Sequence, residues 1–258
     1  MNKVRQALLE RKVTIGTWIQ INHPVVAEIM GNCDYDWIAA DCEHTDIDVE
    51  GFTRIARGLY GRGPEPFVRV RENDTLAIRQ VLDAGARGII VPLIESAQEA
   101  KQVVAASKFP PQGIRGFSFC RGNNYGVDFD EYVSQANQDI AVVVMIESKR
   151  AIDNIDEILS VDGVDGVFIG PYDLSGSYGI PGKTNDVLVQ NGCHEVLEAC
   201  RKANKSAGIH IVIPNPENIR QALKDGFTFI AVGADIVYLN QASQKALKEM
   251  KKYLSILR

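Results

Sequence analysis

Two acidic residues stand just after two neighbouring apolar runs of the sequence. Glu147 follows the run "IAVVVMI", and Asp173 lies three residues beyond the run "GVFIG". If both runs are adjacent parallel strands, their carboxyl ends lie close together, and both carboxylates can bind one divalent cation. Two carboxylates with an otherwise open coordination sphere suit Mg²⁺ or Mn²⁺ better than Zn²⁺. The structural alternative is that Glu147 pairs with an arginine and Asp173 caps the following turn.

A second group of polar residues surrounds the ends of two earlier apolar runs. Asp41, Glu43 and His44 follow one of them, and Arg69 lies at the end of the next. An arginine that points into a barrel needs a carboxylate partner, which is either Asp41 or Glu43 of the protein or the substrate itself. His44, whose ordinary pKa is near neutral, is a candidate general acid or base, and a surface histidine is the alternative. The cluster favours a reaction site over an acid-rich surface turn.

These residues need a fold that brings strand ends together, and the rest of the chain predicts one. Eight apolar runs alternate with segments of helical periodicity; the runs begin at Val13, Asp36, Pro66, Gly88, Ile140, Gly166, Ala207 and Phe227. Eight such alternations predict an α/β fold, a (β/α)₈ TIM barrel, in a single domain over residues 1–258. An open doubly wound sheet would show a Gly-rich turn after its first strand, and "GTWIQINHP" lacks one.

Composition disfavours several classes of function. The net charge is −5, from 28 basic and 33 acidic residues without a basic block, which disfavours nucleic-acid binding. No apolar stretch is long enough to span a membrane, and no apolar region follows the N-terminal charges. The five cysteines lack CxxC spacing, so we expect reduced thiols and a cytoplasmic protein. No lysine lies at a strand end, which disfavours Schiff-base chemistry and leaves metal-assisted polarisation of a carbonyl.

Several linked motifs, in order, resemble the HpcH/HpaI family of metal-dependent (class II) pyruvate aldolases. They are "DWIAADCEH", "VLDAGARGIIVP", "FPPQGIRG", "IESKRAIDNIDEIL" and "GVDGVFIGPYDLSGSYG", and the resemblance runs from about residue 16 to 235. It implies a carbon–carbon lyase that reversibly cleaves a 4-hydroxy-2-oxo (2-keto-3-deoxy) acid to pyruvate and an aldehyde through an enolate. It also implies a divalent cation, Mg²⁺ or Mn²⁺ with Co²⁺ as a further candidate.

The resemblance also implies roles for individual residues. Glu147 and Asp173 would bind the metal, Arg69 would hold the keto or enolate oxygen, and His44, oriented by Asp41 or Asp83, would move the proton; Gly170, Pro171 and Tyr172 would bind substrate. The expected partners are small molecules and further copies of the chain, in a hexamer of three dimers that exchange the last helix. The amphipathic tail "ASQKALKEMKKYLSIL" is compatible with such an exchange.

Two residues depart from the family pattern. Met145 stands where the family often has Gln, and a thioether cannot donate a hydrogen bond to the keto acid. Tyr172 is bulkier than the small residue of some members. We expect the segment 116–130 to govern the choice of aldehyde. Two alternatives stay open, namely an acyl-CoA-type lyase of the same superfamily, which would need a surface for the nucleotide, and a non-catalytic barrel subunit.

Overall fold

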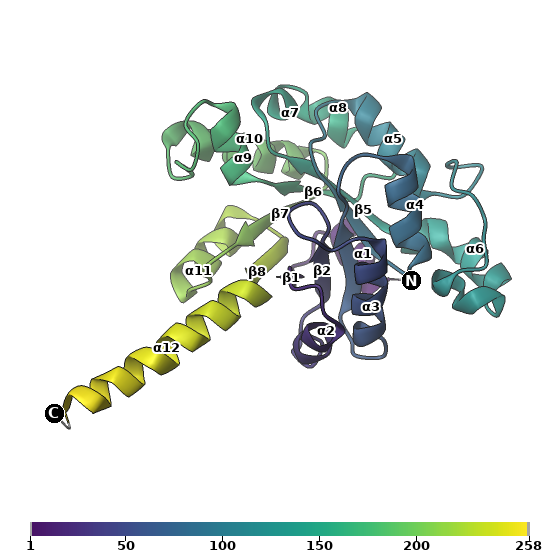
Figure 1. The fold of residues 1–258 in the computed structure, drawn as a ribbon. Coiled ribbons are helices and arrows are strands. Elements are labelled where there is room, and N and C mark those ends of the chain that lie inside the picture. The colour runs from purple at the N-terminus through teal and green to yellow at the C-terminus, as the bar shows by residue number, and fades with distance from the viewer. Residues whose placement is uncertain (1, 257–258) are drawn as a thin grey trace.

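The computed structural model describes residues 2–256, and its centre is a closed barrel of parallel strands (Figure 1). The strands are β1 (Thr14–Ile19), β2 (Trp37–Asp41), β3 (Glu65–Arg69), β4 (Gly88–Val91), β5 (Ala141–Ile146), β6 (Gly166–Ile169), β7 (Ser206–Ile211) and β8 (Phe229–Ala234). They pair in chain order, and β8 pairs with β1 to close the ring. The predicted (β/α)₈ barrel is confirmed, and each strand overlaps one of the eight predicted runs.

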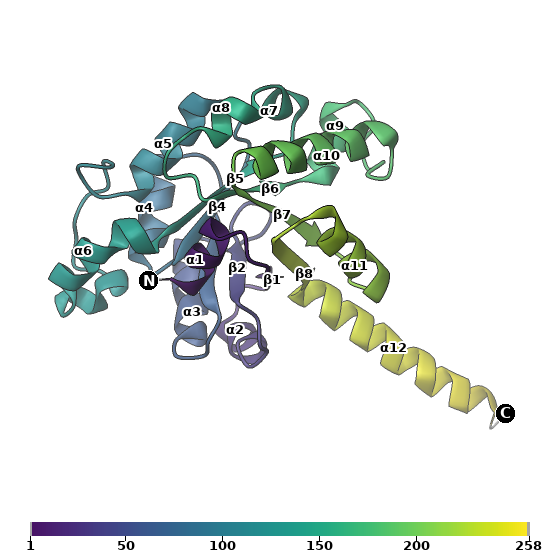
Figure 2. The same cartoon turned by 180° about the vertical axis from the view of Figure 1, so that it is seen from behind.

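Helices cover the outside of the barrel between successive strands (Figures 1 and 2). They are α1 (Lys3–Leu9), α2 (Pro24–Met30), α3 (Val49–Leu59), α4 (Thr75–Asp83), α5 (Ala97–Ser107), the 3₁₀ helix η1 (Arg121–Gly126), α6 (Phe129–Asp139), α7 (Lys149–Asp153), α8 (Ile155–Leu159), α9 (Pro171–Ser177), α10 (Val187–Lys202), α11 (Pro216–Asp225) and α12 (Asp235–Ile256). Side chains that accept hydrogen bonds from the first backbone N–H groups fix where several begin, among them Asp48 at α3 and Asp74 at α4.

Aromatic side chains fill the barrel at the amino ends of its strands. Trp37, Phe67 and Phe229 contact one another, and the stacked rings of Trp37 and Phe229 have centroids 4.1 Å apart. Val4 and Leu8 of α1 are buried in the same apolar cluster. This end of the barrel is therefore packed closed, and the carboxyl ends of the strands are left to form a pocket.

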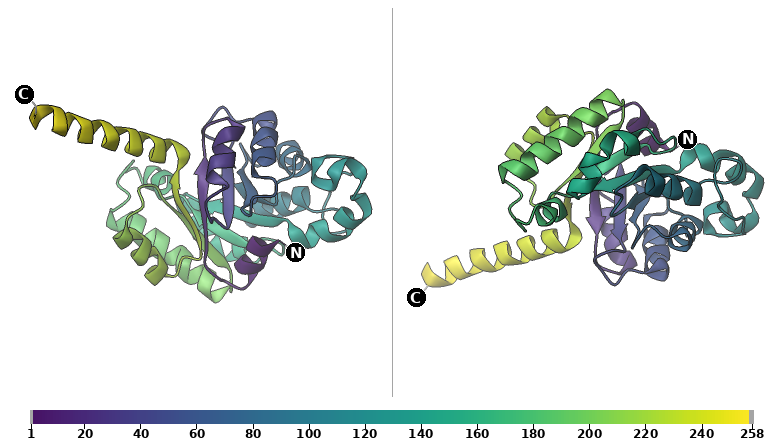
Figure 3. Two further views of the ribbon diagram at one scale, coloured as in Figure 1. Left: turned by 90° about the horizontal axis from the view of Figure 1, so that it is seen from below. Right: turned by 90° about the horizontal axis from the view of Figure 1, so that it is seen from above.

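The C-terminal helix α12 leaves the barrel and projects away from it (Figures 1 and 3). It contacts the barrel beside β8 and β1. Several of its apolar side chains are more than half exposed: Leu239, Leu247, Met250, Tyr253 and Leu254. Among the helices of residues 2–256, none combines the length and the apolar character that crossing a membrane requires.

Two glycines provide the room that the aromatic cluster occupies. A methyl group at Gly16 would lie 2.1 Å from Cδ2 of Trp37, and one at Gly88 would lie 2.2 Å from Cε1 of Phe67. Real carbon–carbon contacts do not reach such distances, so any larger side chain must displace an aromatic ring. Glycine at these two strand positions is therefore required by the packing of the closed end.

We predict that Gly16→Ala lowers the free energy of unfolding by about 1–3 kcal/mol, because it overpacks the aromatic cluster. Gly176→Ala in α9 is the matched control, since a methyl group there meets no atom within 4 Å. Denaturant unfolding of both variants checks this. Equal stability of the two would contradict the packing described here.

Candidate active site

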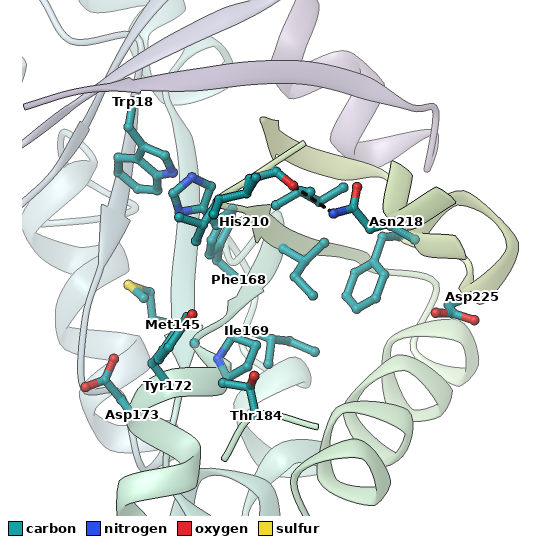
Figure 4. A pocket seen from close by; sticks show the side chains of 18 of the residues that line it. Trp18, Met145, Phe168, Ile169, Tyr172, Asp173, Thr184, His210, Asn218 and Asp225 are labelled. Carbon is teal, nitrogen blue, oxygen red and sulfur yellow. Dashed lines mark hydrogen bonds between the residues drawn. The ribbon is translucent and has the colours of Figure 1, made fainter. Parts of the chain in front are cut away.

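A pocket of about 490 Å³ opens at the carboxyl ends of the strands (Figure 4). Its inner wall is lined by Trp18 of β1, Arg69 of β3, Met145 of β5 and His210 of β7. Asp173 at the start of α9 lies at its side. Polar residues of α11 and of the loop before α10 line its outer part. The pocket therefore lies where a (β/α)₈ barrel places its reacting groups.

The central contact of this region is a paired hydrogen bond between Arg69 and Asp41. Nε and Nη2 of Arg69 lie 2.9 and 2.7 Å from the two carboxylate oxygens of Asp41, which is fully buried. Gln20 Nε2 donates to the same carboxylate at 2.9 Å. Burial alone would raise the pKa of Asp41, but the hydrogen bonds and charge of Arg69 outweigh burial and lower it. The partner of Arg69, left open by the sequence, is thus a carboxylate of the protein.

Asp41 also shapes the turn that follows β2. Its Oδ1 accepts hydrogen bonds from the backbone N–H groups of Glu43 and His44, at 3.1 and 3.3 Å. His44 Nε2 lies 3.6 Å from Oε2 of Glu43, and the imidazole is more than half exposed. One buried carboxylate therefore holds both the arginine and the backbone of the candidate proton-handling residue.

The guanidinium of Arg69 is held on three sides. Besides Asp41, its Nη1 lies 3.2 Å from Oε2 of Glu43, and its central carbon lies 4.9 Å from the ring of Trp18. Burial would lower the pKa of Arg69, but Asp41 and Glu43 raise it overall. The side chain is thus a fixed positive charge that lines the pocket.

Three further carboxylates share this region, and they carry more negative charge than Arg69 can balance. Burial, together with the charges of Glu43 and Asp173, raises the pKa of Glu147 to about 7. Burial also raises the pKa of Glu43, whose buried Oε2 has no hydrogen-bond partner despite its nearness to Arg69. A divalent cation would relieve this repulsion, so the donor set fits a hard metal ion.

The backbone leaves space around Glu147 for such an ion. Glu147 Oε1 accepts a hydrogen bond of 2.7 Å from the N–H of Leu93, which orients the carboxylate. A methyl group at Gly170 would lie 2.7 Å from its other oxygen, so only glycine leaves that oxygen free. Within residues 2–256 no group of three or more His, Cys, Asp or Glu is arranged to hold a metal. With Glu147 and Asp173 as its protein ligands, the ion would take its remaining ligands from water or substrate oxygens.

Of the other residues singled out in the sequence, three line the pocket and one lies at the end of α4. Gly170, Pro171 and Tyr172 line the pocket with Asp173, and Tyr172 is exposed at its rim. Asp83 ends α4, and its Oδ1 accepts a hydrogen bond of 2.7 Å from Nη2 of Arg115. The structure therefore brings His44 together with Asp41 and not with Asp83.

The segment 116–130 also lies elsewhere. It connects α5 to α6, before the amino end of β5, and Arg121 within it donates to the carbonyl oxygen of Ala84 after α4. None of the residues that line the pocket belongs to this segment. Its expected contribution to the choice of aldehyde is therefore not made in the pocket of its own chain.

Two residues that line the pocket, Trp18 and His210, are not among those that the sequence singles out. Both stand inside apolar runs, where they look like ordinary strand residues. Their ring centroids are 5.9 Å apart, and both line the pocket. Only the alternation of inward and outward side chains along a barrel strand could have indicated them.

Comparisons with known proteins agree with this geometry. A 5-keto-4-deoxy-D-glucarate aldolase from Enterobacter sp. is 36% identical over 97% of this chain and 97% of its own length. The crystal structure of an HpcH/HpaI aldolase/citrate lyase family protein from Burkholderia cenocepacia superposes with a TM-score of 0.93 at 31% identity, over 97% of this chain and 100% of that one. A citrate synthase has a TM-score of 0.87 at 27% identity, over 99% of this chain and 100% of that one. Residues 14–242 match the family described as HpcH/HpaI aldolase/citrate lyase. The chain belongs to this family, and it is an aldolase-type carbon–carbon lyase.

Proposed function

We propose that the protein is a class II aldolase that cleaves 5-keto-4-deoxy-D-glucarate or a closely similar 4-hydroxy-2-oxo acid. The observation that carries the proposal is the buried Asp41–Arg69 pair, which fixes a positive charge in the same pocket as Asp173 and near enough to Glu147 to act on the pKa of its carboxyl. The substrate is suggested by the relatives of that name, which are 36% identical over 97% of the chain.

The reaction breaks one carbon–carbon bond of the substrate. The hydroxyl group two carbons from the keto group loses its proton, and the bond between its carbon and the methylene carbon breaks. The electron pair passes into the enolate of pyruvate, which is then protonated at the methylene carbon. The remaining three carbons leave as 2-hydroxy-3-oxopropanoate, an aldehyde that carries a hydroxyl group and a carboxylate.

The residues of the pocket have distinct roles in this proposal. Glu147 and Asp173 would hold Mg²⁺ or Mn²⁺, with Co²⁺ as a third candidate, and a cation bound there supplies positive charge where the enolate develops. Arg69, which Asp41 holds in place, would donate hydrogen bonds to the enolate oxygen. His44 takes the hydroxyl proton, with its backbone fixed by Asp41.

Met145 and Tyr172 distinguish this pocket from the family pattern. Met145 is buried beside Phe168 on the floor of the pocket and supplies no hydrogen-bond donor to the keto acid. Binding of the keto group therefore depends more heavily on Arg69 and the cation. Tyr172 is exposed at the rim, where its ring narrows the entrance next to Asp173.

We predict that Glu147→Gln and Asp173→Asn each lower kcat for pyruvate release from 5-keto-4-deoxy-D-glucarate by about 10²-fold or more, because each removes a charge that holds the cation. EDTA should abolish the reaction, and Mg²⁺ or Mn²⁺ should restore it. Glu157→Gln on the exposed face of α8 is the control and should retain activity. Direct titration of Mn²⁺ into each variant shows whether lost activity follows lost binding.

A substrate panel decides between the aldolase and the thioester alternative. The 27% identical citrate synthase keeps an acyl-thioester reaction open as a second candidate. Release of pyruvate without any cation would contradict the proposal. So would an enzyme that turns over acyl-CoA compounds but no 4-hydroxy-2-oxo acid.

We further propose that the chain forms homo-oligomers in which two copies exchange α12, within the hexamer expected from the family. The exposed apolar side chains of this projecting helix support the proposal, since they would be covered by the barrel of a second copy.

We predict that the double substitution Leu247→Glu and Met250→Glu lowers the molar mass measured by light scattering, because it places charges on the apolar face of α12. Lys248→Glu, on the polar part of the same turn, is the matched control and should leave the mass unchanged. A wild-type mass equal to that of one chain would refute the exchange.

A further inference from the structure

His210 occupies a position in the pocket that the proposed reaction does not use. Ile209 of β7 pairs with Ile169 of β6, which pairs with Ile146 of β5. The residue directly after β5 is Glu147, and the next residue of β7 is His210. His210 is therefore in register with Glu147, two strands away around the barrel.

One hydrogen bond fixes the protonation of the imidazole. Nε2 of His210 lies 2.9 Å from the carbonyl oxygen of Gly233, and a carbonyl oxygen can only accept, so Nε2 carries the proton. Burial lowers the pKa of His210 to about 4, and the charge of Arg69 lowers it as well. The ring is thus neutral, and its Nδ1 holds a free lone pair.

That lone pair has no partner among the described residues, although the ring lines the pocket. The one hydrogen bond of the His210 side chain is the bond to Gly233. Figure 4 shows its ring beside Trp18, with Phe168 and Met145 close by. The indole Nε1–H of Trp18 is buried without a partner. The inner wall thus offers one unpaired acceptor next to one unpaired donor.

A hydroxyl group is the substrate group that suits this combination, because it both donates and accepts a hydrogen bond. We propose that His210 determines substrate specificity by accepting, at Nδ1, a hydrogen bond from a hydroxyl group on the aldehyde part of the substrate. The inference rests on the aldolase function proposed above and deepens it. An aldehyde without that hydroxyl group would leave a buried acceptor unpaired, which is how a binding site rejects a deoxy analogue.

The test is aldol addition to pyruvate with two aldehydes of the same three-carbon skeleton, glyceraldehyde and propionaldehyde. Kinetics are measured for the wild type, His210→Leu, His210→Gln and His194→Leu. Leucine removes the acceptor and keeps roughly the volume of the ring. Glutamine supplies one donor for the Gly233 carbonyl and one acceptor for the substrate. His194 is exposed on α10 and is the matched control.

We expect His210→Leu to lower the ratio of kcat/KM for glyceraldehyde over propionaldehyde about tenfold, the value of one hydrogen bond. His210→Gln should restore most of the ratio, and it provides the test if the leucine variant does not fold. His194→Leu should leave the ratio unchanged.

Three outcomes would overturn the inference. If the folded His210 variants keep the wild-type kcat/KM with both aldehydes, the role of His210 is refuted and the aldolase proposal stands. An equal loss with both aldehydes places His210 in the pyruvate step or in folding and also refutes it. Failure of the wild type to add either aldehyde refutes the aldolase proposal and this inference together.

Discussion

The buried carboxylate of Asp41 is the constraint on which the rest of the site depends. A fully buried carboxylate without partners would be expensive, and removing one member of a buried pair typically costs about 3–5 kcal/mol. Both carboxylate oxygens of Asp41 accept hydrogen bonds from Arg69. The carboxylate also accepts hydrogen bonds from the Gln20 side chain and from two backbone N–H groups. The direction of Arg69 and the turn that carries His44 follow from this one arrangement.

Charge balance around that pair favours the proposed cation. The charges of Glu43, Glu147 and Asp173 act on one another, and the raised pKa of Glu147 reflects burial together with their mutual repulsion. Aromatic packing closes the opposite end of the barrel. A cation that balances the carboxylates would therefore enter from the open end. A cation bound there would offset the acidic side chains and supply positive charge where an enolate develops.

Much of this arrangement can be predicted from the sequence, because strand ends converge in a closed parallel barrel. The eight apolar runs predict the strands, and the position of Glu147 directly after a run predicts that it lies at the mouth. The partner of Arg69 could not be chosen between Asp41 and Glu43 without distances, and both contact it.

Other features escape the sequence for identifiable reasons. Asp83 belongs to a motif of the family, but its position at the end of α4 gives it Arg115 as its partner. The segment 116–130 looks functional because it is long and Gly-rich, but it lies before the amino end of β5, and no residue of it lines the pocket. His210 is hidden within an apolar run, and its exposure to the pocket depends on the register of β6 and β7.

The central claim is that Arg69 and a cation held by Glu147 and Asp173 stabilise the enolate of pyruvate. Exchange of the methyl protons of pyruvate in D₂O, followed by NMR, tests this step alone because it needs no aldehyde. We predict exchange that requires Mg²⁺ or Mn²⁺ and that is lost in Glu147→Gln. Exchange that persists without a cation or in that variant, or a wild type that exchanges no protons, would contradict the claim.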